Sequence, residues 1–102
     1  MKRIRVADLA ERDLDEIWYY VAKQSQSIDI ANTAVESLTG YFSLFAQTPE
    51  AGTRRDDIEV GLRGFPAGKY IIYYRESGEY VVISRVIHGM RDQKTTYNDD
   101  ER

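Results

Sequence analysis

Apolar residues recur at helical spacing in the first half of the chain. Four of them stand at i, i+3, i+4 and i+7 of one stretch: Leu14, Ile17, Trp18 and Val21. This is the stripe of an amphipathic helix, and we predict a helix over about residues 9–24. Asp8 is its expected N-cap, with Glu11 three residues later in capping-box position.

A second amphipathic helix is predicted after a short polar link. Its apolar face comprises Ala31, Ala34, Val35, Leu38, Phe42 and Phe45. Ser27 in the link can cap this helix. Pro49 and Gly52 end it, because proline cannot continue a helix and glycine tolerates the turn. Two such helices joined by a short link form a helical hairpin.

Alternation of apolar and polar residues predicts strands on either side of the hairpin. The predicted strands are residues 2–6, 57–65, 69–75 and 80–87, with turns at 65–68 and 76–79. The order is an N-terminal strand, the helical hairpin and a three-stranded antiparallel meander. We therefore expect an α+β fold whose helices pack on one face of the sheet and leave the other face partly open.

Length and composition indicate one domain and narrow the chemistry. The chain has 102 residues, no cysteine and one histidine, which excludes disulfides and disfavours a zinc site. We expect no cofactor and no metal. No apolar run approaches a membrane span, and the charged N-terminus has no signal-peptide core, so a cytoplasmic protein is expected. We assign residues 1–92 to the domain and 93–102 to a polar, acidic tail that we expect to be mobile, with only Tyr97 to anchor it.

The charge is unevenly distributed. The net charge is −3, and residues 8–47 hold seven acidic and two basic side chains. Residues 53–91 hold seven basic and five acidic side chains, which is only a small positive excess. Proteins that grip nucleic acid contact many phosphates with Lys and Arg. We therefore expect little direct binding of nucleic acid.

Five short motifs follow one another in a specific order: Ala10-x-x-Asp13-Leu14-x-x-Ile17-Trp18-x-Tyr20, Pro49-Glu50-x-Gly52, Gly61-Leu62-Arg63-x-Phe65-Pro66, Lys69-Tyr70-x-Ile72-x-Tyr74-Arg75 and Arg85-Val86-Ile87-His88-Gly89-x-Arg91-Asp92. Together they resemble the RelE/ParE superfamily of toxins from type II toxin–antitoxin systems, over roughly residues 4–92. The Arg-x-Phe-Pro and Arg-Val-x-His-Gly-x-Arg-Asp pieces resemble the ParE branch.

The resemblance implies a toxin that causes growth arrest, as in plasmid stabilization. ParE-branch toxins are understood to act on DNA gyrase, whereas RelE-branch toxins cut mRNA on the ribosome. In both branches a cognate antitoxin, ParD-like for ParE, wraps the toxin in a hetero-oligomer. The chain departs from the strongly basic character of RelE-type nucleases, since it is acidic.

His88 has two interpretations. In a ribosome-dependent endoribonuclease it would act as the acid or base together with Arg63 and Arg85. Arg91 could also stabilise the phosphate, with Tyr74 or Tyr97 nearby. Alternatively it is a strand-end imidazole bonded to Asp92 or to a carbonyl. We favour the second interpretation and expect no catalytic residues. Acid–base catalysis needs an acid and a base, and the sequence offers one histidine without a second evident group.

Arg85 lies in an apolar strand and must find a partner, because an unpaired buried charge is costly. Asp92, Asp13 and Glu16 are the available acids, and a partner protein is the alternative. The residues expected to bind a partner are Arg63, Phe65, Tyr70, Tyr74, Arg85, His88 and Arg91, and those expected to be structural are Asp13, Trp18 and Asp92. We predict a toxin that binds gyrase without catalysis of its own. The rivals are the nuclease and an orphan toxin that has lost its potency.

Overall fold

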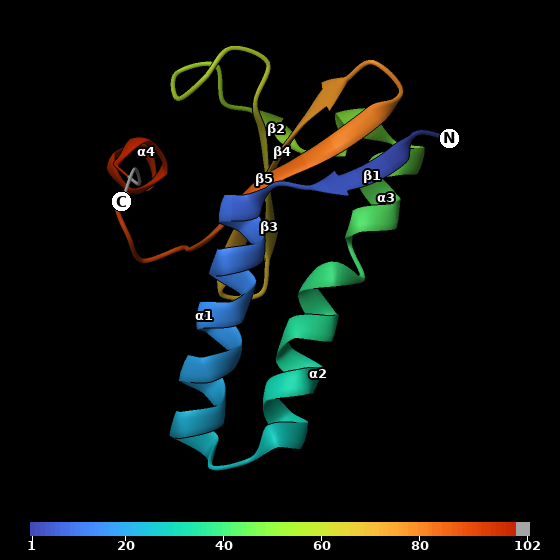
Figure 1. Ribbon diagram of the computed structural model, residues 1–102. Coiled ribbons are helices and arrows are strands. Elements are labelled where there is room, and N and C mark those ends of the chain that lie inside the picture. The colour runs from blue at the N-terminus through green and yellow to red at the C-terminus, as the bar shows by residue number, and fades with distance from the viewer. Residues whose placement is uncertain (100–102) are drawn as a thin grey trace.

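The fold is a mixed five-stranded sheet with a helical hairpin on one face, as the computed structural model describes it for residues 1–99 (Figure 1). The strands are β1 (Arg3–Val6), β2 (Thr53–Arg54), β3 (Arg63–Ala67), β4 (Tyr70–Ser77) and β5 (Tyr80–His88). The helices are α1 (Asp8–Ser25), α2 (Ile28–Thr39), α3 (Phe42–Gln47), the 3-10 turn η1 (Pro49–Ala51) and α4 (Gln93–Asn98).

The sheet has the order β1-β5-β4-β3-β2, in which β1 runs parallel to β5 and the other neighbours are antiparallel. This confirms the predicted α+β class, the N-terminal strand and the meander. The short strand β2 is an addition to the prediction. No helix in residues 1–99 is both long enough and apolar enough to cross a membrane.

The helical hairpin differs from the prediction at two points. Ala7, and not Asp8, is the N-cap of α1, and no side chain caps that end. The Asp8 carboxylate lies in the first turn instead, where it favours the helix dipole. The predicted second helix is broken after Thr39 into α2 and α3, where Gly40 has low helix propensity. The predicted Ser27 cap is confirmed, since its hydroxyl accepts the Ile30 N–H at 3.1 Å.

The predicted strand over 57–65 is wrong in its first half. Residues 56–61 form turns, although Ile58, Val60 and Leu62 alternate as in a strand. The Asp56 carboxylate accepts the Gly61 N–H at 2.8 Å and closes this loop. β3 starts at Arg63 and runs on to Ala67, through most of the predicted turn at 65–68. Since β2 pairs only with the first two residues of β3, the rest of β3 is the edge of the sheet, where Pro66 is tolerated.

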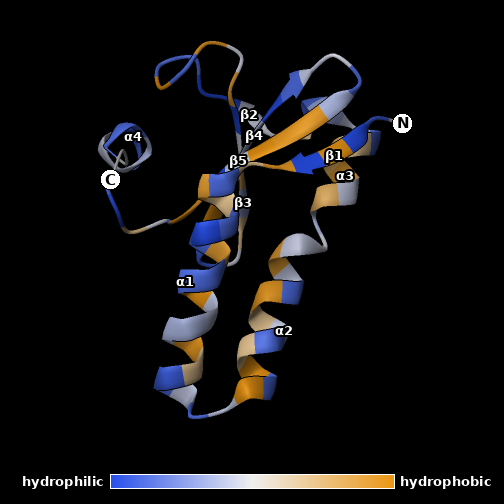
Figure 2. Cartoon of the chain, in the orientation of Figure 1, coloured by the Kyte–Doolittle hydropathy of each residue, from blue (hydrophilic) through white to orange (hydrophobic). Residues whose placement is uncertain are grey.

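Each face of the sheet carries a hydrophobic cluster. On the helical face the Phe45 ring stacks on Tyr74 with 4.1 Å between ring centroids. On the other face Leu62, Tyr73 and Ile87 are buried. The loop before β3 and the α4 helix cover this second cluster, so the face expected to be partly open is covered there. Figure 2 shows that β5 is largely apolar, whereas apolar and polar bands alternate along α1 and α2.

The expected C-terminal tail over 93–102 begins as the helix α4, and Tyr97 packs against the second cluster. The expected domain boundary and the mobility of this tail stay predictions. Residues 100–102 lie outside the described part of the chain.

Tyr74→Phe tests the link between the core and the turn after α3. The Tyr74 hydroxyl donates to the Pro49 carbonyl and accepts the Gly52 N–H, both at 2.7 Å. Its loss leaves these groups without that partner, which costs about 1–3 kcal/mol. We expect the free energy of unfolding in urea to fall by this amount. Tyr19→Phe, on an exposed phenol, is the control, and an equal change in both variants would contradict the prediction.

Candidate functional site

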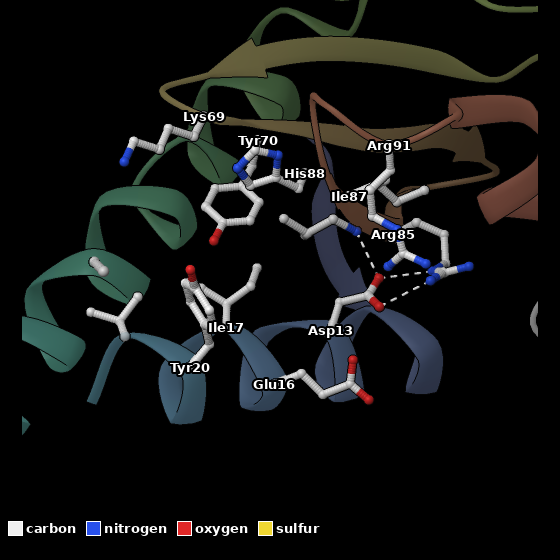
Figure 3. A pocket seen from close by; sticks show the side chains of 13 residues that line it. Asp13, Glu16, Ile17, Tyr20, Lys69, Tyr70, Arg85, Ile87, His88 and Arg91 are labelled. Atoms are coloured by element: carbon white, nitrogen blue, oxygen red, sulfur yellow. Dashed lines mark hydrogen bonds and ion pairs between the residues drawn. The ribbon is translucent and has the colours of Figure 1, made fainter. Parts of the chain in front are cut away.

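The centre of the site is a buried ion pair between β5 and α1 (Figure 3). Arg85 Nε and Nη2 donate to the two carboxylate oxygens of Asp13 at 2.8 and 3.0 Å. Both residues are nearly inaccessible, with exposed fractions of 4% and 6%. Arg85 Nη1 also donates to the Thr96 and Tyr97 carbonyls of α4, and Asp13 accepts the Val86 N–H at 2.8 Å. The pair thus ties α1, β5 and α4 together.

The fold creates this position where β1 ends. The last backbone bond on that side runs from the Ala7 N–H to the Ile83 carbonyl at 2.9 Å. Beyond it, β5 has no strand neighbour on that side within residues 1–99. An irregularity in the register with β4 lies between Tyr73 and Tyr74, opposite the part of β5 that holds Arg85, and irregularities of this kind re-aim side chains. The Asp13 carboxylate then takes the place that a neighbouring strand would have for the Val86 N–H.

A cavity of about 670 Å³ lies beside this pair, between the helical hairpin and the ends of β4 and β5. We refer to it as the α1–β5 cavity. Its lining residues are Asp13, Glu16, Ile17, Tyr20, Val21, Ala34, Lys69, Tyr70, Arg85, Val86, Ile87, His88 and Arg91 (Figure 3). The volume is within the range of sites for small ligands or for anchoring side chains.

His88 lies at the end of β5 and lines the cavity. Its Nδ1 accepts the Met90 N–H at 3.0 Å. Its ring meets the Tyr70 ring edge-on, with 5.1 Å between the centroids. The strand-end position is as predicted, but the predicted partner, Asp92 or a carbonyl, is wrong. A backbone N–H in the tight turn after the strand reaches the imidazole first.

Four of the residues expected to bind a partner come together at the α1–β5 cavity: Tyr70, Arg85, His88 and Arg91. The other three lie elsewhere. Arg63 donates to the Gly52 carbonyl at 2.8 Å. Phe65 packs against Tyr41 and Phe45. Tyr74 is fully buried, so the idea that it contacts a partner is wrong for this structure.

Arg63 is also far from His88 along the sheet. Arg63 pairs with Tyr74, whereas Ala67 and His88 both pair with Tyr70. The row of paired residues that holds Arg63 and the row that holds His88 are thus four residues apart along β4, which is about 13 Å. The structure therefore does not bring together the three residues of the nuclease interpretation.

The residues expected to be structural hold elements together. Asp13 is the partner of Arg85, which selects one of the three acids considered for it. Trp18 Nε1 donates to the Asn32 Oδ1 at 2.8 Å and links α1 to α2. Asp92 caps α4 by accepting the Thr95 N–H at 3.0 Å, and this bond holds the pKa of its carboxyl below the usual value.

Two contributors were not expected from the sequence. Lys69 lines the cavity from the turn before β4. Gln93 accepts a hydrogen bond from the Tyr73 hydroxyl and donates to the His88 and Arg91 carbonyls. Lys69 opens one of the motifs of the family resemblance and Gln93 directly follows the helix cap at Asp92, but neither position signals these contacts. Residues 1–99 contain no cluster of His, Asp or Glu side chains that could hold a metal ion.

Comparisons with known proteins agree in one family. A family model described as ParE toxin of type II toxin-antitoxin system, parDE, matches residues 4–93. The chain is 31% identical to Toxin ParE1 of Caulobacter vibrioides, over 86% of this chain and 90% of that protein. It is 29% identical to Toxin ParE1 of Mycobacterium tuberculosis, over 88% of this chain and 92% of that protein.

Two solved structures share the fold. A chain from the chromosomal ParDE toxin–antitoxin system of Pseudomonas aeruginosa has a TM-score of 0.75 and 20% identity, covering 86% of this chain and 96% of that chain. A chain from the RelBE2 toxin–antitoxin complex of Mycobacterium tuberculosis has a TM-score of 0.55 and 24% identity, covering 85% and 96%.

Asp13→Asn tests the buried pair. Removing one partner of such a pair leaves an uncompensated charge and costs about 3–5 kcal/mol, so we expect a loss of this size in the free energy of unfolding. Asp15→Asn makes the same change on the exposed side of α1 and is the control. Urea denaturation measures both, and similar losses would show that Asp13 has no special role.

Proposed function

The chain belongs to the ParE toxin family of type II toxin–antitoxin systems, and we propose that it arrests growth by binding DNA gyrase. The observation that carries this proposal is the family match over residues 4–93, nearly the whole described chain. Gyrase acts on chromosomal DNA, so the proposed place of action is the cytoplasm. We propose that a ParD-like antitoxin neutralises the toxin in a hetero-oligomeric complex.

The arrangement of the candidate nuclease residues supports binding over catalysis. Metal-free RNA cleavage needs an acid, a base and cations that converge on one phosphate. Arg63 and His88 lie on separate rows of the sheet. Arg85 is committed to Asp13 and to two backbone carbonyls. An endoribonuclease that uses all three residues would therefore have to rearrange β3 and β5.

The β5 edge supports one docking mode for the antitoxin. Strand addition and an amphipathic helix laid in a groove are the two modes expected. Strand addition needs free backbone groups, but the outward Val86 N–H is already bonded to Asp13. The His88 carbonyl next to it accepts from Gln93 and from the Arg91 N–H. We therefore propose that a helix of the antitoxin contacts the α1–β5 cavity through side chains.

Purified toxin tests the gyrase proposal directly. We expect it to reduce the ATP-dependent supercoiling of relaxed plasmid by gyrase, and to induce the DNA-damage response in cells. Toxin premixed with its antitoxin is the control and should leave supercoiling intact. Full supercoiling activity at a large molar excess of free toxin would refute this target.

His88→Ala tests the nuclease rival. If the toxin acts by binding, transcripts stay intact when the wild type is induced, and the variant leaves transcript length unchanged. Mapping of mRNA ends after induction measures this. Rapid transcript cleavage by the wild type that disappears in the variant would establish the nuclease instead.

A further inference from the structure

Three hydrogen-bond donors at the α1–β5 cavity have no partner within residues 1–99: the Lys69 ammonium, the Arg91 guanidinium and one ring nitrogen of His88. Most other cations of the described chain are engaged. Arg54, Arg55, Arg75 and Arg85 each pair with a carboxylate. In a chain of net charge −3, Lys69 and Arg91 make the two sides of the cavity around His88 locally favourable for an anion, although Glu16 also lines the cavity (Figure 3).

The turn after β5 fixes which nitrogen of His88 is the donor. Nδ1 accepts the Met90 N–H, so it carries no proton. A neutral imidazole then has its proton on Nε2. The edge-on contact with Tyr70 holds the ring in place. The cavity therefore receives a donor with a fixed direction and not a freely rotating side chain (Figure 3).

The remaining walls define the rest of the ligand. Ile17, Val21 and Ala34 of the hairpin and Val86 and Ile87 of β5 form an apolar lining. Such a lining accepts an aliphatic or aromatic side chain, and it does not resemble a groove for a phosphate backbone, which is lined by many cations. The cavity thus combines an apolar floor with a charged mouth that holds Lys69 and Arg91 and one exposed acid, Glu16.

We propose that the α1–β5 cavity recognises an antitoxin segment in which a large apolar side chain stands one helical turn from an Asp or Glu. The apolar side chain fills the cavity. The carboxylate accepts from His88 Nε2 and pairs with Lys69, whereas Arg91 lies on the opposite side of His88 (Figure 3). This inference rests on the proposed antitoxin docking and names the chemistry that selects the partner.

A matched pair of substitutions at His88 separates its two hydrogen bonds. In His88→Asn the amide oxygen stands where Nδ1 stood and can accept the Met90 N–H, but the donor to the cavity is lost. In His88→Gln the amide nitrogen stands near the position of Nε2 and keeps that donor. We expect titration calorimetry with the antitoxin to show about tenfold weaker binding for His88→Asn, and binding within a few-fold of wild type for His88→Gln. Equal affinities for the two variants would overturn the proposal.

Lys69→Gln tests the charge at the mouth of the cavity. Lys94→Gln removes the same charge from an exposed position outside the lining of the cavity and is the control. We expect Lys69→Gln to weaken antitoxin binding about tenfold and to reduce the dependence of the affinity on salt, while Lys94→Gln does neither. Identical behaviour of the two variants would overturn the proposal.

Two outcomes distinguish this inference from the function on which it rests. If wild-type toxin fails to bind the antitoxin, the proposed docking fails. If wild type binds and every cavity variant binds equally well, only the carboxylate recognition fails. Binding of a single-stranded RNA oligonucleotide that is lost in both Lys69→Gln and His88→Asn would assign the site to nucleic acid and overturn the proposal.

Discussion

The ion pair between Asp13 and Arg85 is the constraint on which the rest of the structure depends. Two charges removed from water carry a large desolvation penalty, which is offset only when further hydrogen bonds satisfy the remaining groups. Here the Val86 N–H completes the carboxylate, and the Thr96 and Tyr97 carbonyls complete the guanidinium. Each bond attaches a different segment. The pair therefore closes the sheet edge that the short β1 leaves open, and it holds α1 and α4 against β5.

This closure determines which groups remain available to a partner. The Arg85 side chain and the Val86 N–H are engaged, so neither can hold a ligand or receive an added strand without breaking a buried bond. The polar groups that have no partner within residues 1–99 belong to Lys69, His88 and Arg91, which line the cavity beside the ion pair. The cavity between them is a consequence of the way in which the ion pair joins the hairpin to the strand.

Features set by local pattern were predictable, and those set by tertiary contacts were not. The α1 stripe and the apolar runs of β4 and β5 follow from side-chain burial, so they are read directly from the sequence. Residues 56–61 alternate equally well, yet the Asp56 carboxylate closes them into a turn. Arg85 had to find some partner, and the one that it finds, Asp13, lies 72 positions away along the chain. Lys69 opens one of the motifs that carry the family resemblance, but its place at the cavity arises only when β4 meets the hairpin.

The same residue types would suit a nuclease, and the cost of freeing Arg63 and Arg85 bears on that interpretation. A phosphate that recruited Arg85 would have to take it from Asp13, at a cost of about 3–5 kcal/mol. That cost corresponds to at least about a hundredfold in substrate affinity. Arg63 would likewise have to release the Gly52 carbonyl next to the buried Tyr74. Lys69 can meet an incoming carboxylate without breaking any hydrogen bond within residues 1–99. The cost of freeing Arg63 and Arg85 weighs against a nuclease built on these two residues and supports the proposed binding of a partner protein.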